Sequence, residues 1–242
     1  QPGRFPVSEA ADLPLGLPNA RVASLVLTDL IEKHQPKEFE KVKILTLFTC
    51  PPADFMTSKP VRTLKDLKGM ELRVSGTGVD VVKNLGGIPI AMPQSETPEA
   101  IQKGIVKGIV SSMEVLKDMN YAAYCPYATD TSLFIVSFAV VMNREKWNAL
   151  PANVKKVMDD LRVEQAEWTG KYVDSHVSEA LSWSKQKYNH QVIELPAADK
   201  AEIKKLVRPM IDAYVKKVSA QGLPGAEIIA DIERLTKKYD KK

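Results

Sequence analysis

Arg73 is the residue whose type and position most clearly suggest chemistry. It lies in a short apolar strand, residues 70–74, directly before the turn Ser75-Gly76-Thr77-Gly78 and a following helix. In open α/β sheets, ligands bind beyond the carboxyl ends of the strands, and a guanidinium can hold a carboxylate through two parallel hydrogen bonds. The pattern alone leaves two interpretations equally open: Arg73 binds an anion, or it pairs with a nearby acid such as Glu71 or Asp66.

The other residue types that commonly carry chemistry show no catalytic or metal-binding arrangement. The turn after Arg73 matches neither phosphate-binding pattern, G-x-G-x-x-G or G-x-x-x-x-G-K-[ST], and no G-x-S-x-G nucleophile motif occurs. Cys50 and Cys125 could form a disulfide in an oxidising compartment, but their apolar surroundings favour two buried thiols. No Cys/His cluster has metal-ligand spacing, and the histidines are scattered at His34, His176 and His190. We therefore expect no catalytic residue, no metal and no cofactor.

The composition is that of an ordinary globular protein. The 242 residues are 44% hydrophobic and 26% charged, which provides enough apolar surface for a core and excludes disorder as the main state. No apolar run approaches the ~20 residues of a membrane-spanning helix. The sequence starts Gln1-Pro2-Gly3-Arg4 without a basic and then apolar leader, which does not decide the location, because a mature exported protein has lost its leader. The net charge of +4 is too small to predict a nucleic-acid partner, but it permits an anionic small ligand.

Strands alternate with helices from residue 40 to residue 142, which predicts an α/β fold with a largely parallel, buried sheet. The expected strands are 43–49, 70–74, 88–91, 105–111 and 132–142, and the expected helices are 19–34, 64–68, 79–86, 95–103 and 112–123. Residues 1–20, by contrast, contain four prolines, which argue against a continuous helix or strand. We expect an ordered crossing loop there.

Residues 152–188 contain no proline and show apolar side chains at helical spacing. Two consecutive core-facing helices would explain this stripe, but a single helix of about 37 residues would span about 55 Å and could brace two lobes. Gly170, inside the segment, indicates a bend or a close packing contact. A last strand is expected at 191–195, with helices starting at Pro196 and covering 226–242.

Four motifs, in the same order along the chain, resemble those of the substrate-binding subunit of TRAP transporters, the DctP type. The family patterns are F-P-x-x-E…L-P-F, K-P-x-x-x-x-x-D-L-K-G-x-K-x-R-V, L-G-A-x-P-V-x-M and A-L-Q-x-G-V-V-D-G. The matching segments are Phe5-Pro6 with Glu9 and Leu13-Pro14, Lys59-Pro60 to Arg73-Val74, Leu85-Gly86-Gly87 to Met92, and Ala100 to Gly108. Each motif alone would be weak, whereas the ordered set covers nearly the whole chain and is specific.

The resemblance implies an α/β, periplasmic-binding-protein-like fold with two lobes around a cleft and a long helix that bridges the lobes. Family members carry a further segment before the F-P-x-x-E motif, so we expect the N-terminal part of lobe one to be absent from this chain. The expected division is 1–50 and 136–170 for lobe one, 51–135 and 171–242 for lobe two, and 152–188 for the helix that spans both. Hinges are expected at 49–53, at 131–136 and within the long helix.

The resemblance also implies a periplasmic receptor that binds an organic acid anion and delivers it to the membrane permease subunits of a TRAP transporter. In the family, an arginine at the position of Arg73 grips the ligand carboxylate. We expect a monomer without enzymatic activity, whose ligand-binding set is Arg73, Ser75, Gly76, Gln94, Ser111, Ser112, Met113 and Phe55. The alternatives are a small-molecule-metabolising enzyme on an α/β scaffold and a sensor domain for the same ligand, which would be fused to a transmembrane or kinase segment.

Three departures from the family pattern bear on the ligand. Lys107-Gly108 replaces the family's D-G, Ser111 stands where sialic-acid-binding members have an asparagine, and Ala53 stands where those members have a second arginine. A buried polar group without a partner costs about 1–3 kcal/mol, which disfavours a hydroxyl-rich sugar acid as the ligand. We therefore expect an apolar or aromatic monocarboxylate with its carboxylate on Arg73. The residues expected around its body are Phe55, Met56 and Met113.

Overall fold

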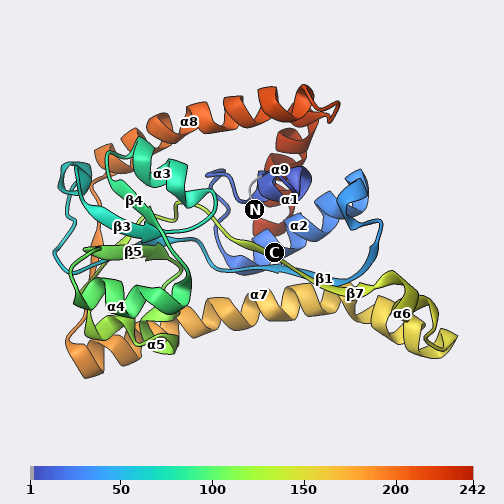
Figure 1. Cartoon of the computed structure of the whole chain (residues 1–242), viewed down its shortest axis with the longest axis horizontal. Helices are drawn as coiled ribbons and strands as arrows, with labels where there is room; N and C mark the ends of the chain where they lie inside the picture. Colours follow the sequence, from blue (N-terminus) through green and yellow to red (C-terminus); the bar gives the residue numbers. More distant parts are fainter. Residues whose placement is uncertain (1–2, 242) are drawn as a thin grey trace.

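The computed structural model describes residues 3–241, and within them the chain forms two lobes built around two separate sheets (Figure 1). The smaller sheet pairs β1 (Val42–Thr49) with β7 (Ser137–Asn143), which run antiparallel. The larger sheet has six strands in the order β4-β3-β5-β2-β6-β8. These strands are β2 (Asp54–Thr57), β3 (Glu71–Val74), β4 (Ile88–Ala91), β5 (Gly108–Ser111), β6 (Tyr127–Asp130) and β8 (Gln191–Glu194).

The larger sheet is mixed, which corrects the expectation of a largely parallel sheet. β3 runs parallel to β4 and β5, and β6 runs parallel to β8, but β2 lies antiparallel to both of its neighbours, β5 and β6. The sequence pattern does not predict β2 or β6. Each has only four residues, and all four residues of β2 are buried, so no alternation marks it.

The first lobe packs α1 (Pro6–Ala11), α2 (Ala20–His34) and α9 (Gly225–Asp240) around β1. α2 confirms the helix predicted over 19–34, and it begins where the Asn19 side chain accepts a hydrogen bond from the Val22 backbone at 2.9 Å. α1 corrects the loop expected over 1–20. Pro6 stands at the first helical position, where its missing N–H would have had no partner inside the helix.

In the second lobe, helices cover both faces of the six-stranded sheet. On one face, α3 (Gly78–Asn84) and the first half of α8 (Ala197–Ser219) bury a core that includes Leu72 and Val207. On the other face, α4 (Thr97–Gln102), α5 (Val115–Asp118) and the end of α7 (Ala152–Tyr188) bury a core that includes Ile109 and Leu116. The remaining short helices are α6 (Arg144–Asn148) and the 3-10 turns Lys37–Phe39, Leu64–Leu67, Gln94–Glu96 and Tyr121–Ala123. Among the described helices, none is long and apolar enough to cross a membrane.

Two long helices, α7 and α8, connect the lobes (Figure 1). α7 is one continuous helix of 37 residues, which confirms the prediction for 152–188. Gly170 of α7 packs against α2 in the first lobe, whereas Leu181 packs against the second lobe's core. α8 makes a second bridge that the sequence analysis did not anticipate, because Val207 lies in the second lobe's core and Ile211 in the first lobe's core. Pro209, inside α8, falls between these two contacts.

The chain itself crosses between the lobes in two segments that lie side by side. Residues 50–53 leave β1 and residues 131–136 enter β7, and the two segments are joined by backbone hydrogen bonds between Ala53 and Phe134 at 2.7 Å and between Cys50 and Val136 at 2.9 Å. The strand expected over 132–142 is therefore corrected: its first residues form the crossing, and β7 starts at Ser137. Asp54 fixes the entry to this crossing, since its Oδ1 accepts hydrogen bonds from the backbone of Thr131 and Ser132.

The C-terminal part of the chain packs differently from the expected division into lobes. The expected division puts residues 211–242 in lobe two, yet Tyr214, Ile228 and Leu235 are buried in the first lobe's core together with α2. The difference follows from α8, which carries the chain back across the molecule before α9 begins.

Candidate ligand-binding site

Arg73 lies on β3 with its side chain on the face of the sheet that also carries Ile109, its partner on β5. The residue is 6% exposed. Its Nε and Nη2 atoms donate to the Met92 carbonyl oxygen at 3.2 and 3.0 Å. Since Met92 follows β4, the strand beside β3, the guanidinium lies at the carboxyl ends of two neighbouring parallel strands.

No carboxylate pairs with this buried guanidinium among residues 3–241. Asp66, one of the two acids considered as a partner, instead accepts hydrogen bonds from the backbone of Arg62 and Thr63 at 2.9 and 2.8 Å. The other, Glu71, forms no ion pair with Arg73 in the described part of the chain. Burial lowers the pKa of Arg73, and Nη1 has no hydrogen-bond partner among the described residues. A buried charge without a counter-ion is costly, so this position favours an incoming anion.

Tyr121 is a neighbour of Arg73 that the sequence analysis did not single out. Its hydroxyl donates to the Gln94 carbonyl at 3.2 Å, and the Thr97 hydroxyl donates to the Pro93 carbonyl at 3.3 Å. Burial raises the pKa of Tyr121, and the Arg73 charge opposes that rise. The three side chains thus hold the loop 92–94 beside the guanidinium. No sequence signal marks Tyr121, because an aromatic residue in an apolar segment usually belongs to the core.

The two predicted serines lie at the end of β5 and directly after it. Ser111 is half-buried, whereas Ser112 is buried and donates to Glu114 Oε1 at 2.5 Å. Glu114 Oε2 is buried without a hydrogen-bond partner in the described chain, and burial raises the pKa of this carboxyl. Cys50, in the first crossing segment, is close enough for Glu114 to act on it: burial raises the pKa of its thiol to about 12, with a smaller contribution from the Glu114 charge. Cys50 and Cys125 are both free thiols, as expected, but Cys50 is only partly buried whereas Cys125 is buried.

The apolar residues predicted for the site lie in the protein interior. Phe55 and Met56 are completely buried in the cores on the two faces of the larger sheet, and Met113 is 5% exposed. β2 is an inner strand whose faces are both covered, so its side chains cannot line an accessible surface in this conformation. Phe55 therefore lines no accessible surface in this conformation, and its contact with the ligand stays a prediction. Ser75 and Gly76 are exposed in the turn after β3, where Gly76 adopts a φ of 57° that glycine takes without strain.

Two cavities flank the crossing between the lobes. The larger, of about 710 Å³, is bounded by α1, β1 and β7 of the first lobe, by α3 of the second lobe and by α8, and its wall includes Gly76, Asp12 and Ser8. The smaller, of about 290 Å³, includes Asp54, Met113 and Asp174. Arg73 is in the wall of neither cavity. Arg73 thus lies beside the loop that carries Gln94, whereas Gly76 and Met113 line cavities whose walls do not include Arg73.

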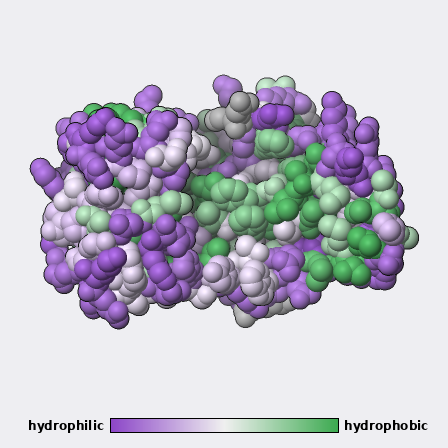
Figure 2. Space-filling model, turned by 60° about the horizontal axis from the view of Figure 1, so that its bottom comes forward, coloured by the Kyte–Doolittle hydropathy of each residue, from purple (hydrophilic) through white to green (hydrophobic). Residues whose placement is uncertain are grey.

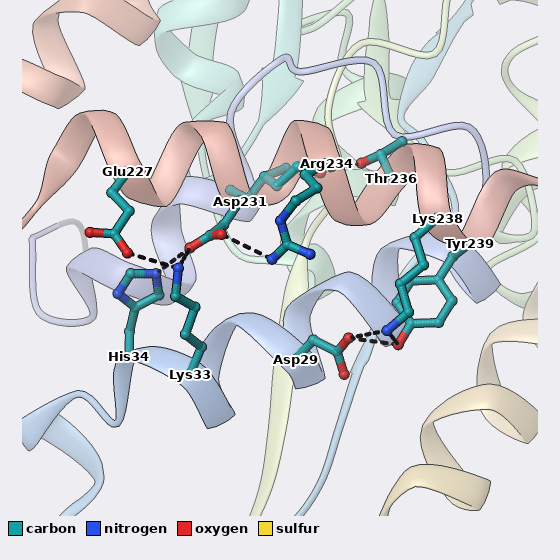
Figure 3. A network of polar contacts seen from close by, with 10 residues as sticks. Asp29, Lys33, His34, Glu227, Asp231, Arg234, Thr236, Lys238 and Tyr239 are labelled. Atoms are coloured by element: carbon teal, nitrogen blue, oxygen red, sulfur yellow. Dashed lines mark hydrogen bonds and ion pairs between the residues drawn. The ribbon is translucent and has the colours of Figure 1, made fainter.

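One group of candidate metal ligands occurs among the described residues, remote from Arg73. His34 on α2 and Glu227 and Asp231 on α9 have ligand atoms within 4.8 Å of one another. Lys33 Nζ lies 2.7 Å from both acids and already balances their charge (Figure 3). Asp231 also accepts from His34 Nε2 at 2.9 Å and Arg234 Nη2 at 3.0 Å. The group is best described as an ion-pair network that joins α2 to α9.

Two lobes, paired crossing segments and two bridging helices define a hinged, ligand-binding class of protein. The family model of the bacterial extracellular solute-binding proteins, family 7 (DctP), matches residues 2–217, and the chain belongs to this family. This confirms the resemblance stated from the motifs and the expected fold class. It also confirms the periplasmic location and the solute-binding rather than enzymatic class.

Known proteins similar to the chain include both curated relatives and solved structures. The outer membrane transporter protein TsaT of Comamonas testosteroni is 27% identical over 92% of this chain and 68% of its own length. A TRAP periplasmic solute-binding protein from Desulfovibrio salexigens, in an open complex with the C-terminus of a symmetry mate in its ligand-binding site, is 49% identical, with a TM-score of 0.92 over 100% of this chain and 76% of that one. A marine metagenome TRAP solute-binding protein specific for aromatic acids, in complex with metahydroxyphenylacetate, is 26% identical, with a TM-score of 0.92 over 99% and 77% of the two chains. The chain spans 62% and 52% of the length of two further curated relatives.

Proposed function

We propose that the protein is an extracytoplasmic solute receptor that binds an organic acid through the guanidinium of Arg73. The observation that carries the proposal is a 6%-exposed arginine with no carboxylate partner in the described chain, at the carboxyl ends of two parallel strands. Nη1 and the second hydrogen of Nη2 remain for a ligand carboxylate, which matches the two-pronged geometry of an arginine–carboxylate pair. The C-terminus in the ligand-binding site of the 49% identical protein supports this chemistry, since a chain ends in a carboxylate.

The ligand we propose is an apolar or aromatic monocarboxylate. Within residues 3–241, the cation at the carboxyl ends of β3 and β4 is Arg73. Ala53 stands where the sialic-acid-binding members of the family have a second arginine, so this site offers one arginine fewer. The similar protein specific for aromatic acids supports this class. Because Phe55 and Met56 are buried, the apolar body of the ligand must be covered by other surfaces, and the lobes would supply them by closing over it.

Closure would also convert binding into a signal for a membrane partner. The crossing segments 50–53 and 131–136, together with α7 and α8, are the elements that must flex when the lobes approach. We propose that the closed, loaded form delivers its ligand to the permease subunits of a TRAP transporter, as the family implies.

Two measurements test the ligand class. Purified protein should be denatured and the released small molecules identified by mass spectrometry. Thermal unfolding should then be followed with benzoate, 3-hydroxybenzoate and phenylacetate, and with succinate, malate and sialic acid for comparison. A free ligand concentration of 100 times the Kd stabilises the folded protein by about 2.7 kcal/mol. For a protein of this size, that raises Tm by about 5–10 °C. Stabilisation by the aromatic acids alone is expected, whereas stabilisation only by the dicarboxylates or the sugar acid would contradict the proposal.

A further inference from the structure

Three consecutive carbonyl groups in the loop 92–94 each accept a hydrogen bond from a different side chain. The acceptors are Met92, Pro93 and Gln94, and their donors, in that order, are Arg73, Thr97 and Tyr121. The loop connects the end of β4 to the 3-10 turn that begins at Gln94. Because Pro93 has no N–H group to donate, side chains carry much of the work of fixing the loop.

The Met92 carbonyl decides which edge of the Arg73 guanidinium is free. It accepts from Nε and Nη2 together, so the side edge of the guanidinium is closed. The end edge, with one hydrogen on Nη1 and one on Nη2, is left for an anion. An arginine and a carboxylate pair best through two parallel hydrogen bonds, which requires their planes to be aligned. A shift of the Met92 carbonyl would therefore turn the end edge out of the plane that a ligand needs.

Tyr121 provides a rigid anchor for this loop. Its side chain is 1% exposed and lies in the same core as Ile109 and Leu116, on the face of the sheet that carries Arg73. The packed ring holds the hydroxyl in place, where it donates to the Gln94 carbonyl at 3.2 Å. Burial raises the pKa of Tyr121 and the Arg73 charge opposes this rise, so the hydroxyl lies close enough to the guanidinium to respond to its charge.

The side-chain bonds to the loop are additional to bonds that the backbone already makes. The Gln94 carbonyl also accepts from the Thr97 backbone N–H, and the Pro93 carbonyl also accepts from the Glu96 backbone N–H at 3.2 Å. Removing the Tyr121 hydroxyl therefore leaves no buried carbonyl without a partner, which is the usual reason why such a change destabilises a fold. The hydroxyl restricts the loop without being required for folding.

All of these contacts lie inside the second lobe. Among the described residues, the two cores of this lobe are built from residues 53–210. Its surface, at the left of Figure 2, is largely hydrophilic, whereas hydrophobic surface gathers in the middle and over the first lobe at the right. The arrangement around Arg73 is thus set within one lobe, before the lobes close over a ligand.

We propose that Tyr121 is a positioning residue for ligand binding. Through the loop 92–94 it holds the Met92 carbonyl against the side edge of Arg73, so that the end edge already faces the ligand carboxylate. A group that is fixed in its binding orientation loses less freedom on association, which raises affinity. The inference rests on the proposed role of Arg73 and adds the residue that orients it.

Calorimetric titration with benzoate tests this role. Tyr121→Phe should bind about three- to tenfold more weakly than the native protein. Thr97→Val should show a smaller loss, because its bond stays within one turn of the chain. Tyr124→Phe is the matched control, since this hydroxyl accepts from Gln102 rather than contacting the loop, and it should bind like the native protein. Circular dichroism should show the native fold in all three variants.

A double-mutant cycle separates positioning from a general structural effect. If Tyr121 acts through the guanidinium, Tyr121→Phe should cause no further loss of benzoate affinity when Arg73 is already replaced by alanine. A structural role would weaken binding equally with and without Arg73.

A second measurement needs no ligand. In protein labelled with 15N-arginine, the Nε–H signal of Arg73 is identified by its absence from the Arg73→Ala spectrum. Hydrogen exchange of this group with water should be at least about threefold faster in Tyr121→Phe, because the loop that covers it is less restricted. The exchange rate should be unchanged in Tyr124→Phe.

The inference and the proposed function can fail separately. Native-like benzoate binding by Arg73→Ala would refute the role of Arg73, and the inference with it. A large loss in Arg73→Ala, together with native-like affinity and unchanged exchange in Tyr121→Phe, would overturn the inference alone. An equal loss from Tyr121→Phe in the native and the Arg73→Ala backgrounds would also overturn it, because Tyr121 would then act independently of the guanidinium.

Discussion

Gly170, in the middle of α7, packs directly against the backbone of Arg21 at the start of α2. A Cβ atom at position 170 would lie 2.5 Å from Arg21 Cα and 2.8 Å from its backbone nitrogen. One turn further along α7, Asp174 accepts hydrogen bonds from the backbone of Ala20 at 2.8 Å and of Arg21 at 2.9 Å, which caps the N-terminus of α2. This close approach fixes the first lobe to the bridging helix.

Gly170→Ala should therefore destabilise the protein. Alanine would gain about 1 kcal/mol from its helix propensity. The obstructing atoms are backbone and cannot rotate away, so overpacking should cost about 3 kcal/mol, the upper end of the usual range, and outweigh that gain. The measurement is urea unfolding followed by circular dichroism. Ser175→Ala, on the exposed side of the same helix, is the control and should change the free energy of unfolding by less than about 0.5 kcal/mol. A Gly170→Ala variant as stable as the native protein would show that the two helices are not in this contact.

The network around Asp231 should make α9 sensitive to acid. Asp231 is buried, which by itself would raise its pKa, but hydrogen bonds from Lys33, Arg234 and His34 lower that pKa to about 2. A carboxyl group whose folded pKa lies below its unfolded value stabilises above about pH 4, and this stabilisation is lost as the pH falls through 2.

Asp231→Asn should accordingly lower the free energy of unfolding by about 1–3 kcal/mol at pH 7. The loss should lie toward the lower end of this range, because Lys33 is half-exposed and solvent screens its charge. The loss should disappear near pH 2. Unfolding in urea at both pH values measures it, with the exposed Glu233→Gln as the control. An equal loss at pH 7 and pH 2 would show that the effect is not one of charge.

Asp12 should give the opposite pH dependence. Its carboxylate accepts a hydrogen bond from the Ser137 backbone at 2.9 Å, where the second crossing segment enters β7. Burial raises its pKa to about 7. The folded protein therefore holds this proton between about pH 4 and pH 7 while the unfolded chain releases it, so stability should fall as the pH rises through that window.

Asp12→Asn keeps an oxygen acceptor for Ser137 and removes the titration. The variant should be more stable than the native protein above pH 7, and the two should converge below pH 4. Part of the native pH slope should remain in the variant, because burial also raises the pKa of Asp54 to about 7. Parallel stability curves for native protein and variant between pH 4 and pH 8 would contradict the assignment.

The parts of the fold that could be predicted are those in which local pattern and final packing agree. α2 has a capping residue and an apolar stripe, and α7 has 37 residues without proline, so both helices appear where their patterns place them. β2 could not be predicted, because four fully buried residues show no alternation. The crossing at 131–136 has an apolar sequence like that of a strand, and it is distinguished by tertiary contacts such as the Asp54 hydrogen bonds to Thr131 and Ser132.

The candidate site was predictable only at Arg73, because a charge inside an apolar strand is visible in the sequence. The complete burial of Phe55 was not predictable, since sequence proximity to the crossing says nothing about which face of β2 is covered. Tyr121 and the carbonyl of Met92, which lie beside the Arg73 guanidinium, come from positions 48 and 19 residues away along the chain. Their approach is a result of sheet order, which a single sequence does not display.

Calorimetric titration of the Arg73→Ala variant, with the ligand identified by mass spectrometry, tests the central claim most directly. Because hydrogen bonds to charged groups contribute about 1.5–3 kcal/mol each, the variant should bind at least tenfold more weakly than the native protein, and Arg73→Lys should fall between them. Arg62→Ala is the control, since it removes an exposed arginine and leaves the guanidinium of Arg73 and its neighbours in place, and it should bind like the native protein. Native-like affinity in a folded Arg73→Ala variant would contradict the account, whereas a selective loss in the Arg73 variants is the result that it predicts.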